Sequence, residues 1–395
     1  MFKKTSNEKT LLKNNTGRRV DFDYLRAFVV LLVVYHHSII AYATFAYINP
    51  ENPIATFSPV VNEQRLELFD LFIAYNDVYF MQLMFFISGL FVWSSLNKKG
   101  IKNYLRDRIK RLAIPFIICV PTLIPLAYYP ALMEVQNIHG GDTGYMEFWS
   151  ILIRHGFGTA GPLWFLWVLL VFDFIAALLY HLVPNIKNII MRASRLFVSP
   201  LIFFIALIGI TTLVYIPILS FSDSQQWIGL GPCTFQVSRA LMYLVYFLTG
   251  AAFGIYGLNN SLLSKDGLLA KRLWIWTTIS PLCFTGFILA AITKNFNPYI
   301  MGFILVVTCA AIILSTIAVF VRYVHKRYRI LDSFSNNSFG IYIVHYSFMT
   351  WLQYWLLPSK IHPFFKGTFV FIATVIFCWI IIAAIRKIPY VKKVI

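Results

Sequence analysis

Two ionisable side chains, Arg26 and His37, lie eleven positions apart in an apolar segment near the start of the chain. In an α-helix, eleven residues make about three turns plus 20°, so both side chains lie on one face, roughly 16 Å apart. Ionisable groups at membrane depth are costly unless they face a protein interior or a wet cavity, so this pair indicates a functional site. An imidazole there can act as a general base or as a nucleophile. The neighbouring His36 points about 80° away from this face, so we predict that His37 is the reactive group.

The composition indicates that these residues belong to a membrane protein. Of the 395 residues, 59% are hydrophobic and 13% are charged, whereas an ordinary soluble domain has about 25% charged residues. The apolar stretches have the length of transmembrane helices, and they do not alternate as the short strands of an outer-membrane barrel do. We predict an all-α polytopic integral membrane protein with about ten transmembrane helices, over 27–48, 72–96, 112–132, 162–183, 199–220, 237–257, 273–292, 299–321, 337–357 and 366–385.

The positions of the basic residues predict the orientation of these helices. If both termini are cytoplasmic, 28 of the 34 lysines and arginines fall in inside segments, as the positive-inside rule requires. This favours a multi-pass protein of the inner or plasma membrane, with tails over 1–25 and 387–395 and one membrane domain over 26–386. Because basic residues recur at every second loop, the net charge of +18 indicates contact with membrane lipids and not with nucleic acid. The sequence leaves the oligomeric state open.

No metal site is expected. The eight histidines form no HxxxH pair and no carboxylate-flanked cluster. Four of the five cysteines lie within apolar spans, which is typical of small core residues, and Cys233 lies in an outside loop.

Several segments share their residues and order with a known family of membrane enzymes. They are Arg26 followed after ten residues by His37; Phe85-Phe86-Ile87-Ser88-Gly89; the loop Arg106–Arg111 with Pro115 beyond it; and Gly161–Leu166 with, late in the chain, Phe339–His345. Together they resemble the membrane acyltransferase-3 family, in the branch that includes the periplasmic glucan succinyltransferases. The resemblance implies transfer of an acetyl or succinyl group from cytoplasmic acyl-CoA to a hydroxyl of an envelope or exported glycan or glycolipid.

The resemblance also implies roles for the basic residues. His37 would take the proton of the acceptor hydroxyl, or would carry the acyl group covalently. Arg26 would guide the pantetheine or the thioester toward His37. Arg108 and Arg111 would bind the phosphates of CoA through bidentate guanidinium contacts, unless they only anchor the loop to lipid headgroups.

The chain departs from the family pattern at two points. Longer members append an extracytoplasmic serine-hydrolase-like domain, whereas this chain ends soon after the tenth expected span, so we expect a stand-alone enzyme. Asp77 takes the place of a histidine that relatives carry at the outer end of this helix, which bears on acceptor binding.

Four further residues are candidates, each with a structural alternative. Asp173 interrupts the fourth span and is expected near the depth of His37, where it would orient that ring, bind a proton or pair with arginine or tyrosine groups. Ser88 either donates to the acyl carbonyl or marks close helix packing beside Gly89. Trp164 is a site residue or an interfacial aromatic, and His345 is a site residue or a hydrogen-bonding partner of a neighbouring helix.

A different function also fits ten helices with ionisable groups, namely a transporter or flippase for a polysaccharide or lipid intermediate. Such proteins often contain paired helices interrupted by glycine or proline. The sequence shows no such pairing, which favours the enzyme. Acidic residues in the first outside loop fit either sugar binding or a solvated surface, and they are Glu51, Glu63, Glu67, Asp70 and Asp77.

Overall fold

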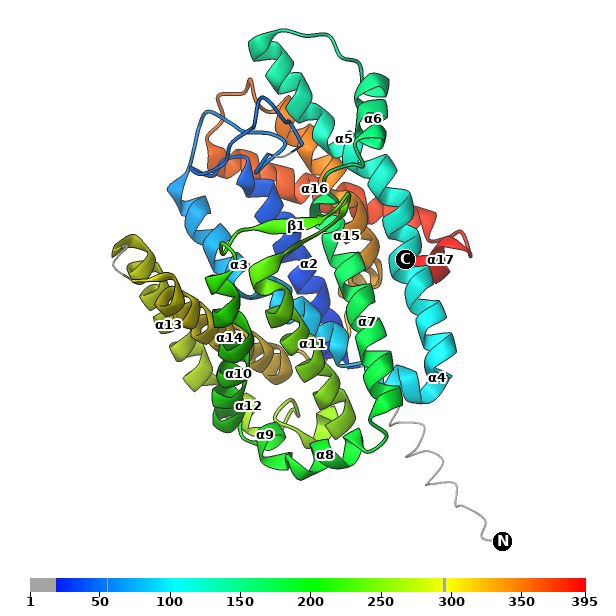
Figure 1. The fold of residues 1–395 in the computed structure, drawn as a ribbon, viewed down its shortest axis with the longest axis vertical. Helices are drawn as coiled ribbons and strands as arrows, with labels where there is room; N and C mark the ends of the chain where they lie inside the picture. The colour runs from blue at the N-terminus through cyan, green and yellow to red at the C-terminus, as the bar shows by residue number, and fades with distance from the viewer. Residues whose placement is uncertain (1–18, 55, 294–295) are drawn as a thin grey trace.

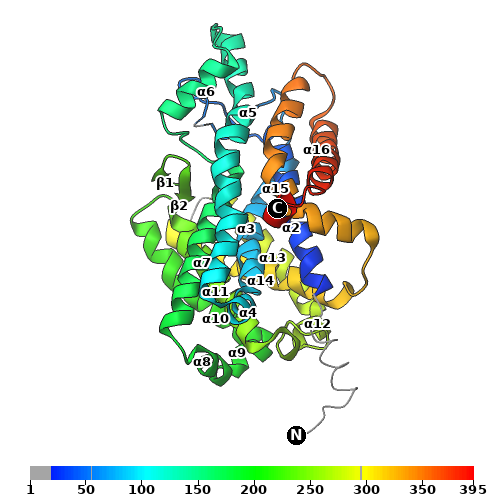
Figure 2. The ribbon, with the colours of Figure 1, turned by 90° about the vertical axis from the view of Figure 1, so that its right-hand side faces the viewer.

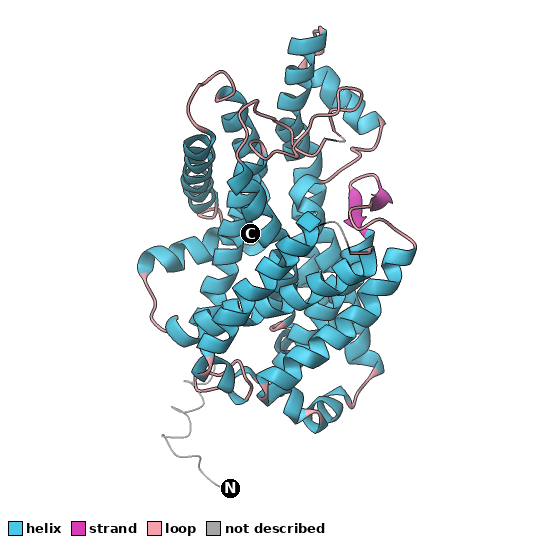
Figure 3. Cartoon of the chain, turned by 90° about the vertical axis from the view of Figure 1, so that its left-hand side faces the viewer, coloured by secondary structure: helices cyan, strands magenta, loops and turns pink. Residues whose placement is uncertain are grey.

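The structure, a computed structural model, describes residues 19–54, 56–293 and 296–395. Over these ranges the chain forms helices and one short antiparallel hairpin, which Figure 3 shows in magenta. The hairpin pairs β1 (Trp227–Leu230) with β2 (Cys233–Gln236).

Nine helical stretches within the described ranges are long and apolar enough to cross a membrane. They are α2 (Val20–Ile40), α3 (Glu67–Gly89), the stretch Val92–His139, Gly161–Leu182 with α7 (Trp164–Leu182), Pro200–Ser220 with α10 (Pro200–Tyr215) and η3 (Ile216–Ser220), α11 (Val237–Tyr256), α13 (Leu273–Thr293), α14 (Pro298–Tyr323) and α16 (Pro363–Ile385). The expected span 337–357 falls in α15 (Arg329–Trp355), which is long enough but carries many polar residues. The all-α polytopic membrane fold is therefore confirmed, with α15 as a less apolar tenth long helix.

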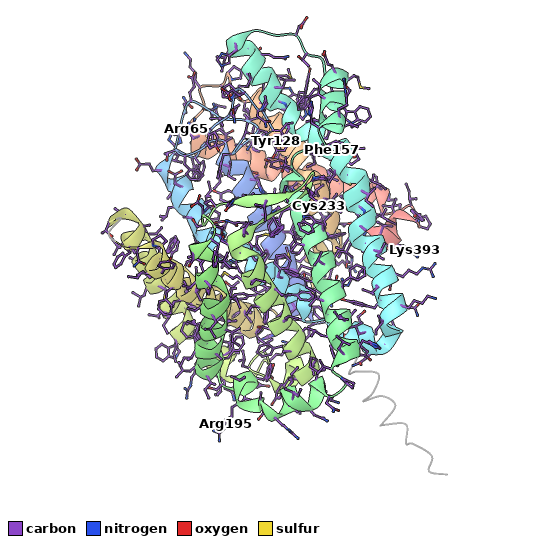
Figure 4. All side chains as sticks on the ribbon, in the orientation of Figure 1. Arg65, Tyr128, Phe157, Arg195, Cys233 and Lys393 are labelled. Carbon is purple, nitrogen blue, oxygen red and sulfur yellow. The ribbon has the colours of Figure 1, made fainter. Side chains whose placement is uncertain are left out.

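Shorter elements connect or follow the long helices. They are α6 (Tyr145–Arg154), η2 (Gly161–Leu163), α8 (Ile186–Arg192), α9 (Ser194–Val198), η4 (Leu258–Asn260), α12 (Leu268–Lys271) and α17 (Val391–Val394). The loop residues 41–54 and 56–66, α6 and the hairpin lie toward one end, here called the hairpin end, whereas α8, α9 and α12 lie at the other, the α8 end (Figures 1 and 2). Arg65, expected outside, and Arg195, expected inside, lie at these opposite ends (Figure 4).

The first helix differs from its expected bounds. α2 runs over Val20–Ile40 instead of 27–48, so His37 lies in its last turn and not near its centre. Asp21 and Asp23 in the first turn favour the early start, because carboxylates stabilise a helix N-terminus. The residues after Ile40 are still largely apolar, which is why hydropathy gave no sign of the end.

The segment 98–111, expected as a loop, is helical. α4 (Val92–Arg108) continues through a π-helical turn, η1 (Ile109–Ala113), into α5 (Ile114–His139). Within α4 the helical backbone is interrupted at Gly100, whose φ of 72° glycine adopts without strain. The prediction of a loop was wrong because the remaining residues are mostly good helix formers, although they are charged.

α2 lies at the centre of the bundle, where it packs against α3, α14, α15 and α16 (Figure 1). α3 and α11 also approach closely, because glycines leave room between their backbones. A Cβ atom at Gly89 would lie 2.0 Å from the carbonyl oxygen of Phe247, and one at Gly250 would lie 2.1 Å from that of Phe86. This packing brings polar residues of α3 and α11 together beside α2.

The two ends of the bundle give a test of the predicted orientation. Epitope tags inserted near residues 140 and 225 should be accessible from outside intact cells, whereas tags at Gly100, in 322–334 and at both termini should not, because basic residues concentrate in the latter segments. α17 packs against η1, so the C-terminal tag should behave as the Gly100 tag does. Protease protection of each tagged protein measures this, and one reversed position would contradict the topology.

Candidate active site

The ring of His37 lies beside that of His345, which comes from α15. Nδ1 of His37 is 3.5 Å from Nε2 of His345 and 2.9 Å from the carbonyl oxygen of Val33. Nδ1 of His345 is 2.6 Å from the carbonyl oxygen of Tyr342. A carbonyl oxygen only accepts, so in the neutral rings each Nδ1 carries the proton and each Nε2 carries a lone pair. The Nδ1–H of His37 thus faces two acceptors, and its Nε2 stays available as a base or nucleophile.

A buried amide fixes the backbone that carries His37. The Nε2 of Gln353, also in α15, donates to the carbonyl oxygens of His37 and Ser38 at 3.0 and 3.1 Å. Gln353 is 1% exposed, so this contact is protected from water. It also satisfies carbonyls in the last turn of α2 that have no partner within the helix. α15 therefore holds His37 through both its ring and its main chain.

His37 faces a large cavity of about 1890 Å³. The cavity reaches the loops at the hairpin end, where its lining includes carboxylates and aromatic rings that can hold a sugar. Tyr128 and Phe157, labelled in Figure 4, contribute to this wall. Of the five acidic residues expected in the first outside loop, three line the cavity, and they are Glu51, Asp70 and Asp77.

Trp164 lies in the wall of this cavity and of a smaller adjoining pocket that His37 also lines. Its ring centroid lies 5.6 Å from those of Tyr243 and Trp227, and 6.2 Å from that of Phe85. These rings come from α11, β1 and α3, so Trp164 joins three elements around the site. The structure thus places Trp164 with the histidines, as a site residue requires.

His36 lines the same cavity as His37, which the helical-face argument did not predict. The two ring centroids lie 5.3 Å apart, and the ring of His36 stacks on Phe80 of α3 at 5.1 Å. The cavity is wide enough around α2 to reach both faces. The two histidines still differ in one contact, because His37 contacts His345.

A charge pair that the sequence analysis missed lies in the same cavity. Arg239 donates from Nη2 to Oδ2 of Asp77 at 2.7 Å and from Nη1 to the carbonyl oxygen of Asp77 at 2.8 Å. The Arg239 side chain is 5% exposed, whereas that of Asp77 is 43% exposed. One signal could have found the pair: each residue is an isolated charge within an apolar helix.

Asp173 lies away from the histidines. Its carboxylate accepts a hydrogen bond from the hydroxyl of Tyr104 at 2.5 Å and pairs with Nε of Arg108 at 3.3 Å. It lies nine residues after Trp164 in α7, about 14 Å further along the helix. The expectation that Asp173 shares the depth of His37 was wrong, and its observed role is to pair with arginine and tyrosine groups.

The remaining basic candidates differ in their surroundings. Arg108 lies over the ring of Tyr104, 5.1 Å from its centroid, and its side chain is 23% exposed. Arg111, in η1, is exposed. Arg26 lies 4.0 Å from Asp23 and its side chain is 40% exposed. Arg108 and Arg111 thus lie on one helical stretch, but Arg108 is paired and partly buried whereas Arg111 is exposed. Their spacing of three residues in the sequence did not indicate this difference.

Ser88 does not reach the histidine site. Its hydroxyl donates to the carbonyl oxygen of Met84 at 2.8 Å, within α3. Close packing at the adjacent Gly89 supports the structural alternative for this segment. In the described ranges, no group of three His, Cys, Asp or Glu residues could hold a metal ion.

The fold and the site together place the chain in a class of proteins: polytopic membrane proteins that carry a histidine pair at a large, partly polar cavity. Residues 19–383 match the family model described as an acyltransferase domain. The match covers most of the chain, so the chain belongs to this family of membrane acyltransferases. The resemblance found in the sequence is confirmed, and the family favours the enzyme over the transporter or flippase.

Curated relatives share a name that refers to glucans. Glucans biosynthesis protein C of Escherichia coli (strain SMS-3-5 / SECEC) is 25% identical over 251 residues, which covers 60% of this chain and 59% of the relative. Its namesake in E. coli O139:H28 (strain E24377A / ETEC) is 24% identical over 257 residues, covering 62% and 60%. The chain thus spans less than two thirds of the length of these relatives. No solved structure matches the chain significantly.

The Asp77–Arg239 pair gives a prediction about stability. Asp77→Ala leaves a buried guanidinium without its carboxylate and should destabilise the protein by about 3 kcal/mol or more. Arg239→Met leaves a carboxylate that water can reach, so the cost should be about 1 kcal/mol. Thermal unfolding of the purified variants in detergent measures both effects. Equal losses would show that the two charges are solvated alike, contrary to their exposures.

Proposed function

We propose that this acyltransferase moves an acetyl or succinyl group from cytoplasmic acyl-CoA to a hydroxyl of an envelope or exported glycan or glycolipid, in the inner or plasma membrane. The observation that carries the proposal is the arrangement of His37, whose Nδ1–H is engaged by Val33 and His345 while its ring lines the cavity. This leaves Nε2 with a lone pair at the place where an acceptor can enter.

The reaction then follows ordinary acyl-transfer chemistry. Nε2 of His37 takes the proton of the acceptor hydroxyl while the oxygen attacks the thioester carbonyl. The carbon–sulfur bond breaks, and the CoA thiolate leaves and receives the proton from the imidazolium. The lone pair on Nε2 of His345 faces the Nδ1–H of His37 and stabilises the positive charge that forms there. In the covalent alternative, Nε2 of His37 attacks the thioester carbonyl first, the carbon–sulfur bond breaks, and the CoA thiolate leaves and takes up the Nδ1 proton of the acylated ring. The acceptor hydroxyl then attacks the acyl carbon, the acyl–nitrogen bond breaks, and the hydroxyl proton returns to His37.

The donor would be held on the other side of the reaction centre. Arg108 and Arg111 lie on the helical stretch that begins at α4, near the end where basic residues concentrate. Asp173 engages Nε of Arg108, so a phosphate would bind at the terminal nitrogens, beside Tyr104. Arg111 is exposed and can take a second phosphate. Arg26, on the His37 helix, would guide the pantetheine toward the reacting histidine.

The acceptor would enter at the hairpin end. Carboxylates such as Glu51 and Asp70 can accept hydrogen bonds from sugar hydroxyls, and exposed rings such as Tyr47 and Trp227 can stack on sugar faces. The relatives named for glucan biosynthesis agree with a glycan acceptor. Mass spectrometry of surface glycans from cells with and without the gene tests this directly, because loss of an acyl mass identifies both the group and the acceptor.

The first catalytic prediction concerns the adjacent histidines. His37→Ala should lower the rate of acyl transfer by about 10²–10⁴-fold, because it removes the base and little packing volume. His36→Ala should have a smaller effect, since His36 lacks the contact with His345. Release of CoA thiol and labelling of the glycan, both in proteoliposomes, give the rates. Equal partial losses in two well-folded variants would refute the assignment of His37.

The second prediction concerns the donor site. Arg108→Gln strands the buried Asp173, so it is paired with Asp173→Asn to keep the fold. Adding Arg111→Gln should raise the dissociation constant for acyl-CoA, because both guanidinium contacts are lost. Lysine at both positions should restore binding only in part, because an ammonium lacks the bidentate geometry.

The matched control for this test is Arg106→Gln, an exposed arginine of the same segment, which should not change donor binding. Isothermal titration of acyl-CoA into each purified form gives the affinities. If the Gln variants bind acyl-CoA as the wild type does, neither arginine binds the donor: Arg108 then serves the ion pair with Asp173, and Arg111 serves the membrane surface.

A further inference from the structure

The reaction proposed above leaves one developing charge without a partner in the protein. When the thioester carbonyl is attacked, its oxygen becomes an oxyanion, and one hydrogen-bond donor at such an oxygen is worth about 10²–10³ in rate. Ser88, the residue expected to donate there, instead donates to the carbonyl oxygen of Met84 within α3. A donor that replaces it has to lie beside His37 in the cavity wall, because the attacked carbon comes close to Nε2.

Tyr346, in α15, lies at this place. Its ring centroid is 5.3 Å from that of His37, with the two planes 75° apart, and both residues line the cavity. The neighbouring Tyr342 uses its proton elsewhere, because its hydroxyl donates to the carbonyl oxygen of Pro162. In the described part of the chain, the hydroxyl of Tyr346 interacts instead with another hydroxyl, that of Tyr128 in α5.

A chain of three hydroxyl groups connects Tyr346 to the backbone. The N–H of Gly161 donates to Oγ1 of Thr159 at 3.0 Å. The hydroxyl of Tyr128 forms hydrogen bonds with those of Thr159 and Tyr346. All three hydroxyl residues line the cavity. Three hydroxyls carry three protons, whereas the two links between them use two, so one proton is left for a ligand in the cavity.

The N–H of Gly161 favours one direction for this chain. An N–H group only donates, and a hydroxyl that accepts a hydrogen bond becomes a stronger donor. In the favoured order, Thr159 donates to Tyr128 and Tyr128 donates to Tyr346. The remaining proton is then the phenolic proton of Tyr346, beside His37.

The packing around Tyr346 holds its ring in place. Gly161, the first residue of η2, has a φ of 49°, which glycine adopts without strain. A Cβ atom there would lie 3.5 Å from Cε1 of Tyr346, so the η2 backbone rests on this ring. Tyr346 and Tyr128 are both buried. A donor that is held in place and shielded from water needs no reorganisation when the charge develops.

We propose that Tyr346 donates a hydrogen bond to the thioester carbonyl oxygen as the oxyanion forms, and that Tyr128 and Thr159 polarise its hydroxyl. The inference rests on the proposed acyl transfer at His37 and adds an oxyanion site to it. The phenol keeps its proton throughout. The π electrons of the carbonyl move onto its oxygen during the attack and return when the carbon–sulfur bond breaks.

Substitution by phenylalanine separates the hydroxyl from the ring. Tyr346→Phe keeps the ring contact with His37, so its effect reports the hydroxyl alone. We expect kcat to fall by about 10²–10³-fold with little change in the KM for the donor, because the contact strengthens only in the transition state. Tyr128→Phe should lower kcat by about three- to tenfold, since the donor remains but loses its polarising partner.

The matched control is Tyr354→Phe, which removes another hydroxyl from α15. The hydroxyl of Tyr354 accepts from Asn137 at 3.3 Å, and Tyr354 does not line the cavity, so kcat should not change. Rates are measured in proteoliposomes as release of CoA thiol from acetyl-CoA or succinyl-CoA. The acceptor is the unacylated surface glycan of cells that lack the gene.

Infrared difference spectroscopy reads the same contact without turnover. The probe is an analogue of acetyl-CoA or succinyl-CoA in which a methylene group replaces the thioester sulfur and the carbonyl carbon carries an isotope label. A donated hydrogen bond weakens the carbon–oxygen double bond, so the carbonyl band should lie at lower frequency in the wild type than in Tyr346→Phe. A tyrosine with a merely structural role would leave this band unchanged.

Two results would overturn the proposal: equal carbonyl frequencies in the wild type and Tyr346→Phe, or a kcat of that variant within about threefold of the wild-type value. His37→Ala should keep the frequency difference, because Tyr346 still contacts the carbonyl when the base is absent. The same difference in a wild type that acylates no glycan would refute the proposed transfer and support the oxyanion site, so the two failures are distinguishable.

Discussion

The contact between α15 and the last turn of α2 is the constraint on which the site depends. Gln353 holds the main chain of His37 and Ser38, and His345 meets the ring of His37. Because the two contacts come from one buried helix, the ring cannot turn without losing an acceptor for its Nδ1–H. A base that is fixed in its tautomer and orientation before substrate binds needs no reorganisation during the reaction.

This constraint also explains why α15 is less apolar than the other long helices. Two of its buried serines bond to neighbouring helices: Ser335 donates to the carbonyl oxygen of Asp23 at 3.0 Å, and Ser347 donates to that of Leu123 at 2.8 Å. α15 is thus hydrogen-bonded to α2 near both ends of α2, through Ser335 and Gln353. Through Ser347 it is also hydrogen-bonded to α5. A helix that faces protein on most sides can carry polar groups at membrane depth, because each group finds a partner there.

The sequence predicted the long helices, because hydropathy is a local property, whereas the catalytic role of His37 stays a prediction. Prediction from the sequence failed where tertiary contacts determine the partners and the position of a residue. The residues between Lys98 and Arg111 are mostly good helix formers, but their charges favoured a loop, and the isolated charges of Asp77 and Arg239 marked each residue without identifying its partner. Asp173 was placed by its distance along the chain, whereas its position is set by Tyr104 and Arg108. The partners of a charge in an apolar helix depend on which helices pack together, and a single sequence does not contain that information.

α7 connects the two sides of the proposed reaction. Trp164 at its start lines the cavity with His37, and Asp173 holds Arg108 about 14 Å further along the same helix. An acyl-CoA whose phosphates were bound at Arg108 would have to extend its pantetheine along α7 to bring the thioester to the histidine. A rigid helix fixes that separation, so the carboxylate that neutralises Arg108 and the ring beside His37 stay at a constant distance. The ion pair at Asp173 therefore serves the proposed chemistry by positioning Arg108, without contact with the reacting atoms.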